Sequence, residues 1–291
     1  MPRTSPRLLV TAATGQLGRK VVAELLKKVP ATDLAVAVRD AGKAADLAAA
    51  GVDVRIADYS HAEGWDAALA GIERVLLISS SEVGQRVAQH RNVIDAAVRA
   101  GVALIGYTSV LRADTSELGL AVEHRETEAL LRASGLPVVL LRNGWYTENL
   151  TYSLAHELAS GVRFGSAGDG LISTASRDDY AAAAATVLAG NGHAGKTYEL
   201  AGDSAYTLAE YTAEVSRLSG KQVAYQDLPQ ADYRASLLKA GLPAPFAEML
   251  ADNDAAAARG ALFDDGHQLS ALIGRPTTPL AETLRAALAA V

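Results

Sequence analysis

The chain has 291 residues, of which 49% are hydrophobic, so it can bury one large core or a core and a half. Its net charge of −6 provides no basic surface for nucleic acid, and no apolar run is long enough to cross a bilayer. Cysteine is absent, which excludes disulfides, thiolate catalysis and Cys-ligated metals. Arg3 and Arg7 precede an apolar stretch that is too short for a signal peptide. We therefore expect a soluble, cytoplasmic enzyme that binds neither nucleic acid nor membrane.

The stretch Leu8–Gly18 begins as an apolar run and breaks at Gly15 and Gly18. It leads into Arg19–Lys28, where apolar residues recur at helical spacing. A buried strand, a glycine turn and a helix form the first half of a mononucleotide-binding unit, in which N–H groups of the helix N-terminus bind a pyrophosphate. This context predicts dinucleotide binding rather than a purely structural turn.

Ala12 stands where the dinucleotide-binding fingerprint has its first glycine. A methyl group is tolerable there if φ is negative, whereas a positive φ would store about 1–3 kcal/mol of strain. We expect the methyl group to be tolerated.

Apolar runs and helical segments alternate after this first unit, and a glycine follows each expected helix. The expected strands are Leu34–Val38, Val52–Ala57, Val75–Ile78, Ala103–Tyr107 and Pro137–Leu141. The expected helices are Ala41–Ala50, His61–Ala70, Gln85–Ala100 and Glu123–Ser134. This alternation predicts an α/β fold with a Rossmann-type, doubly wound parallel sheet.

The regular alternation of expected strands and helices ends at about Leu150. We expect a Rossmann domain over residues 1–150 and a smaller α/β substrate-binding cap over residues 151–291, some segments of which return to the Rossmann sheet. Strands are expected at Thr197–Leu200 and Val223–Gln226. Helices are expected at Tyr152–Ala159, at Arg177–Leu188, after the capping box Thr207–Glu210, at Ala231–Lys239 and from Pro279 onward.

Ligands of such sheets bind beyond the carboxyl ends of the parallel strands. This rule selects candidate cofactor-binding residues in the first turn and at the later strand ends. They are Ala12, Thr14, Gly15, Gln16, Leu17, Gly18, Arg39, Lys43, Asp58, Tyr59, Ser79, Ser80, Ser81, Tyr107, Thr108, Ser109, Asn143 and Gly144.

Arg39 lies about 20 residues after the glycine turn, where NAD enzymes carry a carboxylate for the ribose 2′-hydroxyl. A guanidinium suits the 2′-phosphate of NADPH instead, with Lys43 as a second cation. Alternatively, Arg39 is an ordinary surface residue, and Asp40 would repel a phosphate if it faced inward. We predict NADPH as the cofactor, with NADH bound more weakly.

Several polar residues have both a functional and a structural interpretation. Asp58 and Tyr59 either bind adenine or serve as a helix N-cap and a core aromatic residue. Phe263–His267 is expected to be a loop and helix start rather than a metal site. We likewise expect a solvated helix face, and no metal, where acidic residues and a histidine crowd together at Glu123, His124, Glu126 and Glu128.

No tyrosine is followed four positions later by lysine, so the usual proton relay of ketone reductases is absent. Reduction of a quinone gives a stabilised phenolate that water can protonate, so the missing relay favours such easily reduced acceptors. Asn143 is a candidate to bind the nicotinamide or the acceptor carbonyl, and Trp145 with Tyr146 to form a flat wall for an aromatic acceptor. The alternative for this segment is a packed hinge between domains.

Motifs over nearly the whole chain resemble those of the bacterial NAD(P)H:quinone oxidoreductase type 2 family. Members of that family are atypical short-chain dehydrogenases with an NmrA-like domain. The motifs are Thr11–Gly18, Ala37–Arg39, Ala57–Tyr59, Leu76–Arg86, Gln89–Asn92, Tyr107–Ser109, Leu141–Asn149, Tyr198–Ser204, Leu262–Asp265 and Leu272–Gly274.

The resemblance implies NADPH-dependent, two-electron reduction of quinones without flavin or metal, with a pocket between a Rossmann domain and its cap. It implies that Asn143 and Tyr146 act as catalytic residues that orient the acceptor, while solvent or a hydroxyl supplies the proton. A reductase of triphenylmethane dyes and a non-catalytic NmrA-type redox sensor remain alternatives. An isomerase that holds NAD tightly is less favoured, because its chemistry also needs a proton relay. The sequence does not decide the oligomeric state, and a homodimer is compatible with it.

Overall fold

The computed structural model describes residues 7–291, so Arg3 lies outside the described residues. The chain forms two compact units. Unit 1 contains the described part of Met1–Ala113 together with Val122–Asn143 and Arg177–Tyr198. Unit 2 contains Asp114–Ala121, Gly144–Ser176 and Glu199–Val291. Val122–Asn143 therefore belongs to unit 1, although Asp114–Ala121, which precedes it in the chain, belongs to unit 2.

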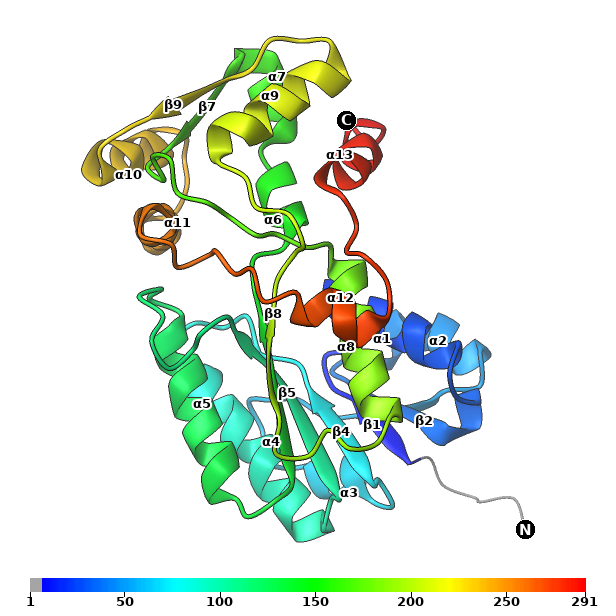
Figure 1. The fold of residues 1–291 in the computed structure, drawn as a ribbon. Coiled ribbons are helices and arrows are strands. Elements are labelled where there is room, and N and C mark those ends of the chain that lie inside the picture. The colour runs from blue at the N-terminus through cyan, green and yellow to red at the C-terminus, as the bar shows by residue number, and fades with distance from the viewer. Residues whose placement is uncertain (1–6) are drawn as a thin grey trace. The chain divides into compact units, whose positions relative to one another are not determined.

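A seven-stranded sheet in the order β3-β2-β1-β4-β5-β6-β8 forms the centre of unit 1 (Figure 1). The first six of these strands pair in parallel, as predicted. The strands are β1 (Leu8–Val10), β2 (Leu34–Val38), β3 (Asp53–Ile56), β4 (Arg74–Leu77), β5 (Leu104–Val110), β6 (Val138–Asn143) and β8 (Thr197–Leu200). The Rossmann-type doubly wound fold predicted from the alternation of apolar runs is therefore confirmed.

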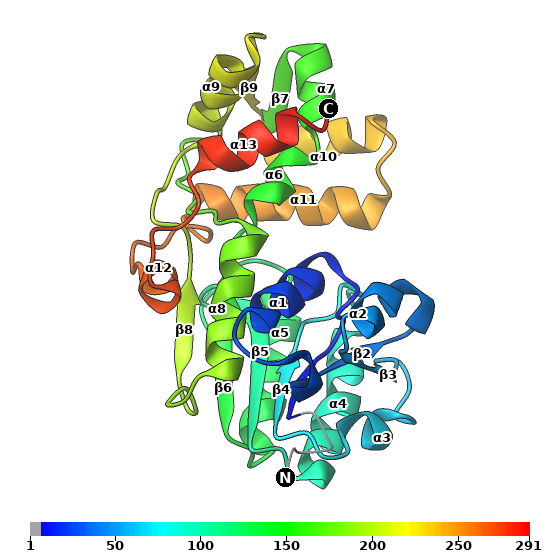
Figure 2. The same ribbon diagram turned by 90° about the vertical axis from the view of Figure 1, so that its right-hand side faces the viewer.

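Helices cover both faces of this sheet (Figures 1 and 2). Helices α3 (Trp65–Leu69), α4 (Arg86–Ala100) and α5 (Ala121–Ala133) contribute Trp65, Ile94 and Leu131 to one core with the strand residues Leu9, Val75 and Ile105. On the other face, α1 (Gln16–Leu26) packs against α8 (Arg177–Ala189). The short elements are η1 (Ala31–Asp33), η2 (Ala41–Ala44) and α2 (Ala45–Ala49).

Two expected helices differ in the structure. Ala41–Ala50 is a 3-10 turn followed by a short α-helix. The helix expected from His61 begins only at Trp65, because Gly64 precedes it with a left-handed φ of +91°. Apolar residues recur at helical spacing in both segments, but a 3-10 turn in the first and Gly64 in the second delay the start of the α-helix.

The turn between β1 and α1 depends on a close backbone approach at Gly18. A Cβ atom on Gly18 would lie 2.3 Å from the Ala12 carbonyl oxygen and 2.8 Å from Ala13 Cα. Ala12 itself has φ +49°, so the negative φ that would make its methyl group harmless is not adopted. The expectation that the methyl group of Ala12 is tolerated at a negative φ is therefore wrong. Ala12 has a left-handed conformation, which costs an alanine roughly 1–2 kcal/mol.

The helix face expected to be solvated is largely buried. Glu128 is 1% exposed and accepts two hydrogen bonds from Arg142, at 2.9 Å from Nε and 2.8 Å from Nη2. Ser109 Oγ donates to the same carboxylate at 2.6 Å. Burial raises the pKa of Glu128, but these donors outweigh it and hold the pKa below its usual value. The expectation of a solvated face fails because α5 turns this side toward β5 and β6; Glu126 alone of the four is exposed.

Two neutral histidines lie in the same core. Tyr107 OH and His124 Nδ1 are 2.7 Å apart, and His90 Nδ1 lies 3.0 Å from Thr127 Oγ1. Burial and the nearby Arg86 charge lower the pKa of His90 to about 3 and that of His124 to about 2. Both imidazoles are therefore uncharged at neutral pH.

Unit 2 pairs β7 (Val162–Gly165) with β9 (Ala224–Asp227) in parallel. Its helices are α6 (Thr147–Thr151), α7 (Leu154–Ser160), α9 (Leu208–Ser219), α10 (Gln230–Lys239), α11 (Ala244–Ala258), α12 (Gln268–Ile273) and α13 (Leu280–Leu288). The predicted capping box is confirmed, since Thr207 and Glu210 cap each other's backbone N–H at the start of α9. Helix α11 and strand β7 were not anticipated, and Pro279 caps α13 rather than beginning it.

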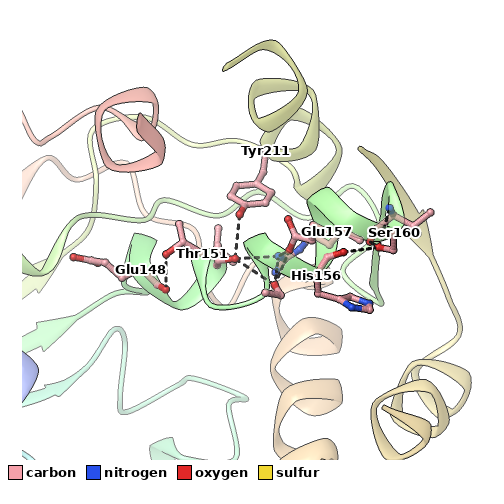
Figure 3. A network of polar contacts seen from close by, with 10 residues as sticks. Glu148, Thr151, His156, Glu157, Ser160 and Tyr211 are labelled. Atoms are coloured by element: carbon pink, nitrogen blue, oxygen red, sulfur yellow. Dashed lines mark hydrogen bonds and ion pairs between the residues drawn. The ribbon is translucent and has the colours of Figure 1, made fainter. Parts of the chain in front are cut away.

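A buried ion pair lies in the interior of unit 2 (Figure 3). Arg163 Nη1 donates to Glu157, whose side chain is 1% exposed, and the Arg163 guanidinium lies 5.0 Å from the centre of the Tyr211 ring. Tyr211 OH donates to the Leu150 carbonyl at 3.0 Å. These contacts connect α7, β7 and α9.

We predict that Gly18→Ala destabilises the protein by about 2–3 kcal/mol, because its Cβ meets fixed backbone rather than a movable side chain. Urea unfolding measures the effect. Gly119→Ala is the matched control: a Cβ there has no neighbour within 4 Å. Equal midpoints for the two variants would contradict this account of the turn.

We predict that the protein loses stability between pH 7.5 and pH 5.5. A histidine whose pKa is depressed in the folded protein binds a proton in this pH range only when the chain is unfolded, where its pKa is about 6.5. At pH 5.5 this proton binding lowers the free energy of unfolding by about 1.4 kcal/mol per histidine. His90→Gln should reduce this pH dependence by the share of one histidine, about 1.4 kcal/mol, measured by urea unfolding at both pH values. His61→Gln, at an exposed position in the same unit, should leave the pH dependence unchanged; an unchanged dependence in His90→Gln would refute the assignment.

Candidate functional site

The start of α1 has the properties of an anion site. Gly15 is its N-cap, no side chain caps that end in the described chain, and no acidic residue lies in the first turn. Gly15 and Gln16 are exposed and Thr14 is half-buried, whereas Leu17 is buried and only its backbone can face a ligand. Backbone N–H groups at such a terminus favour a phosphate through hydrogen bonds and the helix dipole.

Arg39 lies at the carboxyl end of β2 and is 70% exposed in its side chain. Its neighbour Asp40 is exposed, and its Oδ1 accepts a hydrogen bond from Gly42 N at 2.8 Å, so this side chain caps the turn that follows β2. Lys43 lies in the same turn, and its carbonyl accepts from Arg19 Nη2 at 2.5 Å. Arg19, which sequence reasoning did not single out, ties α1 to this turn and also pairs with Asp46 at 2.8 Å.

Asp58 is not the helix N-cap that its structural alternative described, because Gly64 is the N-cap of α3, whereas Tyr59 packs as a largely buried aromatic residue. Asp58 Oδ1 accepts from Ser60 N at 2.9 Å and caps the turn there. The Tyr59 ring stacks on Trp65 with centroids 5.6 Å apart, and its hydroxyl donates to the Ile78 carbonyl at 2.6 Å or to Thr11 Oγ1. Burial raises the pKa of Tyr59. Adenine binding by these two side chains stays a prediction.

Buried side chains form hydrogen bonds with the backbone of the serines that follow β4. Ser80 N donates to His90 Nε2 at 2.9 Å, and Arg86 Nε donates to the Ser80 carbonyl at 2.7 Å. Ser79 N donates to Thr108 Oγ1 at 2.8 Å. Ser81 is exposed. Both polar groups of the Ser80 backbone are therefore occupied, so the segment has a defined shape before any ligand binds.

The three candidates of β5 are more deeply placed than expected. Strand β5 continues to Val110, and Tyr107 is fully buried in the core with its hydroxyl at His124. Because no part of its side chain is exposed, only the Tyr107 backbone is a candidate for a cofactor contact, and that contact stays a prediction. Thr108 and Ser109 are also buried, at 2% and 5% exposure, and are engaged with Ser79 and Glu128.

Asn143 ends β6 and is the last residue of this segment in unit 1, where its carbonyl accepts from Leu111 N at 2.9 Å. Gly144 begins the next segment of unit 2, and its N–H donates to the Leu200 carbonyl at 2.7 Å. Tyr146 forms an isolated bridge with Ala175 and caps α6. Trp145 and Tyr146 are half-buried.

Three residues next to the candidate site were not selected from the sequence as site residues: Arg86, His90 and Glu82. Arg86 and His90 are one helical turn apart on α4, which is the signal that could have placed them on one face. Within residues 7–291 no cluster of His, Asp and Glu could hold a metal ion, and no helix is long and apolar enough to cross a membrane.

Known proteins share this architecture over nearly its full length. Quinone oxidoreductase 2 of Escherichia coli (strain K12) is 56% identical over 277 residues, covering 95% of this chain and 97% of that protein. The crystal structure of the NADPH-dependent quinone oxidoreductase of E. coli complexed with NADPH has a TM-score of 0.94 at 56% identity, covering 96% and 99% of the two chains. Citrobacter sp. triphenylmethane reductase complexed with NADP(H) has a TM-score of 0.92 at 39% identity, covering 96% and 99%.

A family model described as NAD(P)H-binding matches residues 12–191, which is more than half of the chain. The matched span includes the glycine turn, Arg39 and the serines after β4. The chain is therefore a member of the NAD(P)H-binding family, in the branch of the type 2 quinone oxidoreductases.

Proposed function

We propose that the protein is an NADPH-dependent oxidoreductase that transfers a hydride to quinones. The observation that carries the proposal is the exposed Arg39 guanidinium at the carboxyl end of β2, in the unit that also presents the uncapped start of α1. Together they supply binding groups for a 2′-phosphate and a pyrophosphate. The similarity to the E. coli quinone oxidoreductase, which extends over both chains, supports the acceptor class.

The residues at this edge of unit 1 fit a phosphorylated dinucleotide. Gly18 lets the first turn of α1 pack against the loop that links it to β1, so the N–H groups of the helix start lie at the carboxyl end of β1. Arg39 and Lys43 would hold the 2′-phosphate, and Ser79–Ser81 would line the ribose and nicotinamide. The nicotinamide, when bound, supplies the hydride.

Asn143 and Tyr146 would orient the acceptor. The Asn143 amide has a donor and an acceptor group for a carbonyl or carboxamide, and Trp145 with Tyr146 would provide a flat aromatic wall. A reduced quinone is a weakly basic phenolate, so these residues need not supply a strong acid. This agrees with the absence of a tyrosine followed four residues later by lysine.

The similarity to Citrobacter triphenylmethane reductase keeps dye reduction as a second candidate, because a cationic triphenylmethane dye also accepts a hydride without a proton requirement. A redox sensor of the NmrA type would bind NADP(H) without turnover. Turnover assays separate all three functions.

We predict that Arg39→Ala raises the dissociation constant of NADPH by about 10- to 100-fold and changes that of NADH less than threefold, since a charge-assisted contact to phosphate contributes about 1.5–3 kcal/mol. Fluorescence titration of the two coenzymes measures this. Arg99→Ala, which removes an exposed arginine paired with Asp66, is the control and should alter neither value. A parallel loss for both coenzymes would rule out a 2′-phosphate role for Arg39.

We predict that NADPH is consumed with a benzoquinone and not with a simple ketone, followed by the loss of absorbance at the nicotinamide band. Tyr146→Phe should raise KM for the quinone several-fold and leave KM for NADPH unchanged, because the hydroxyl assigned to the acceptor is removed. Turnover with the dye but not the quinone would assign the dye reductase function. Tight binding of NADPH with no turnover of any acceptor would assign the sensor.

A further inference from the structure

The Arg39 guanidinium already has a negatively charged neighbour. Arg39 Nη1 lies 3.5 Å from Glu82 Oε1, and the two side chains are 70% and 42% exposed. Glu82 is distant in sequence and lies in the segment after β4, whereas Arg39 ends β2. The carboxylate therefore reaches the guanidinium from another strand end of the same sheet.

Glu82 is held in this position by a buried side chain. Its Oε2 accepts a hydrogen bond of 2.7 Å from Gln89 Nε2, and Gln89 is 3% exposed. The same Nε2 also donates to Ser60 Oγ at 3.1 Å. The Glu82 backbone N–H donates to Ser80 Oγ at 3.2 Å. Most exposed carboxylates sample many rotamers, but this one has an anchored oxygen, which lowers the entropy lost in facing Arg39.

The segment that carries Glu82 is itself fixed at both sides. Arg86 Nε and His90 Nε2 bind the backbone of Ser80, before Glu82. Gly84 N, after Glu82, donates to Glu123 Oε1 at 3.0 Å, and Glu123 pairs with Arg86 at 3.2 Å. The position of the Glu82 carboxylate thus follows from the core of unit 1.

Two further charged side chains near this edge, Asp40 and Arg19, have partners of their own. Asp40 accepts from Gly42 N, and Arg19 pairs with Asp46. We infer that Glu82 is a specificity-determining residue: its carboxylate competes with the 2′-phosphate of NADPH for Arg39 and narrows the preference for NADPH over NADH. This inference rests on the proposed function. A bound 2′-phosphate carries a charge of about −1.5 to −2 and must displace or lie beside this carboxylate.

The test uses two nucleotides that differ only in the 2′-phosphate. The affinities of 2′,5′-ADP and 5′-AMP are measured by calorimetry for the wild type and Glu82→Gln at low salt. Glu82→Gln should bind 2′,5′-ADP about two- to fivefold more tightly and leave 5′-AMP unchanged. The gain should shrink at about 0.5 M salt, where exposed charges are screened, and in an Arg39→Ala background, where the competed group is absent.

Glu73→Gln is the matched control. It makes the same change of charge in unit 1 but at the amino end of β4, where Glu73 pairs with Arg7. The inference is overturned if both glutamine variants improve 2′,5′-ADP binding equally, if Glu82→Gln weakens it, or if both nucleotides gain equally. A wild type that prefers 2′,5′-ADP, with no change in Glu82→Gln, removes only this inference. A wild type that binds neither nucleotide removes the proposed function as well.

Discussion

The contact between Gly18 and the Ala12 carbonyl is the constraint on which the nucleotide edge of unit 1 depends. It lets the first turn of α1 pack against the loop that links it to β1, so the N–H groups of the helix start lie at the carboxyl end of β1, which has β2 and β4 as its neighbours in the sheet. Ala12, in the same loop, has a left-handed conformation that most proteins reserve for glycine. The turn between β1 and α1 thus contains a strained residue at Ala12.

Behind this edge, buried polar side chains hold the strand ends in place. Arg86 and His90 bind the Ser80 backbone, and Arg142 with Glu128 ties β6 to α5. A buried charge pair of this kind is costly unless its hydrogen bonds are made, and Glu128 meets three donor residues: Arg142, Ser109 and Arg132. These buried hydrogen bonds fix the backbone at the ends of β4 and β6.

Patterns within one segment predicted most of the fold correctly. Leu34–Val38 and Thr197–Leu200 are strands with the expected bounds, and the capping box at Thr207 forms as expected. Helix α11 was missed because Pro243 and Pro245 look like breakers, although proline is well tolerated in the first turn of a helix. Strand β7 is short and half-exposed, so it has little hydrophobic signal.

The sequence by itself determined most strands and helices in their order along the chain, the glycine turn and the kinds of residue at each strand end. These features follow from local periodicity and backbone preference. Only the tertiary structure decided how the charged and aromatic side chains are used. Tyr107 points into the core, Asp40 caps its own turn, and Glu82 approaches Arg39 from a different strand end. The reason is physical: the partner of a side chain depends on which segments the sheet brings together, and that proximity has no periodic signature in the chain.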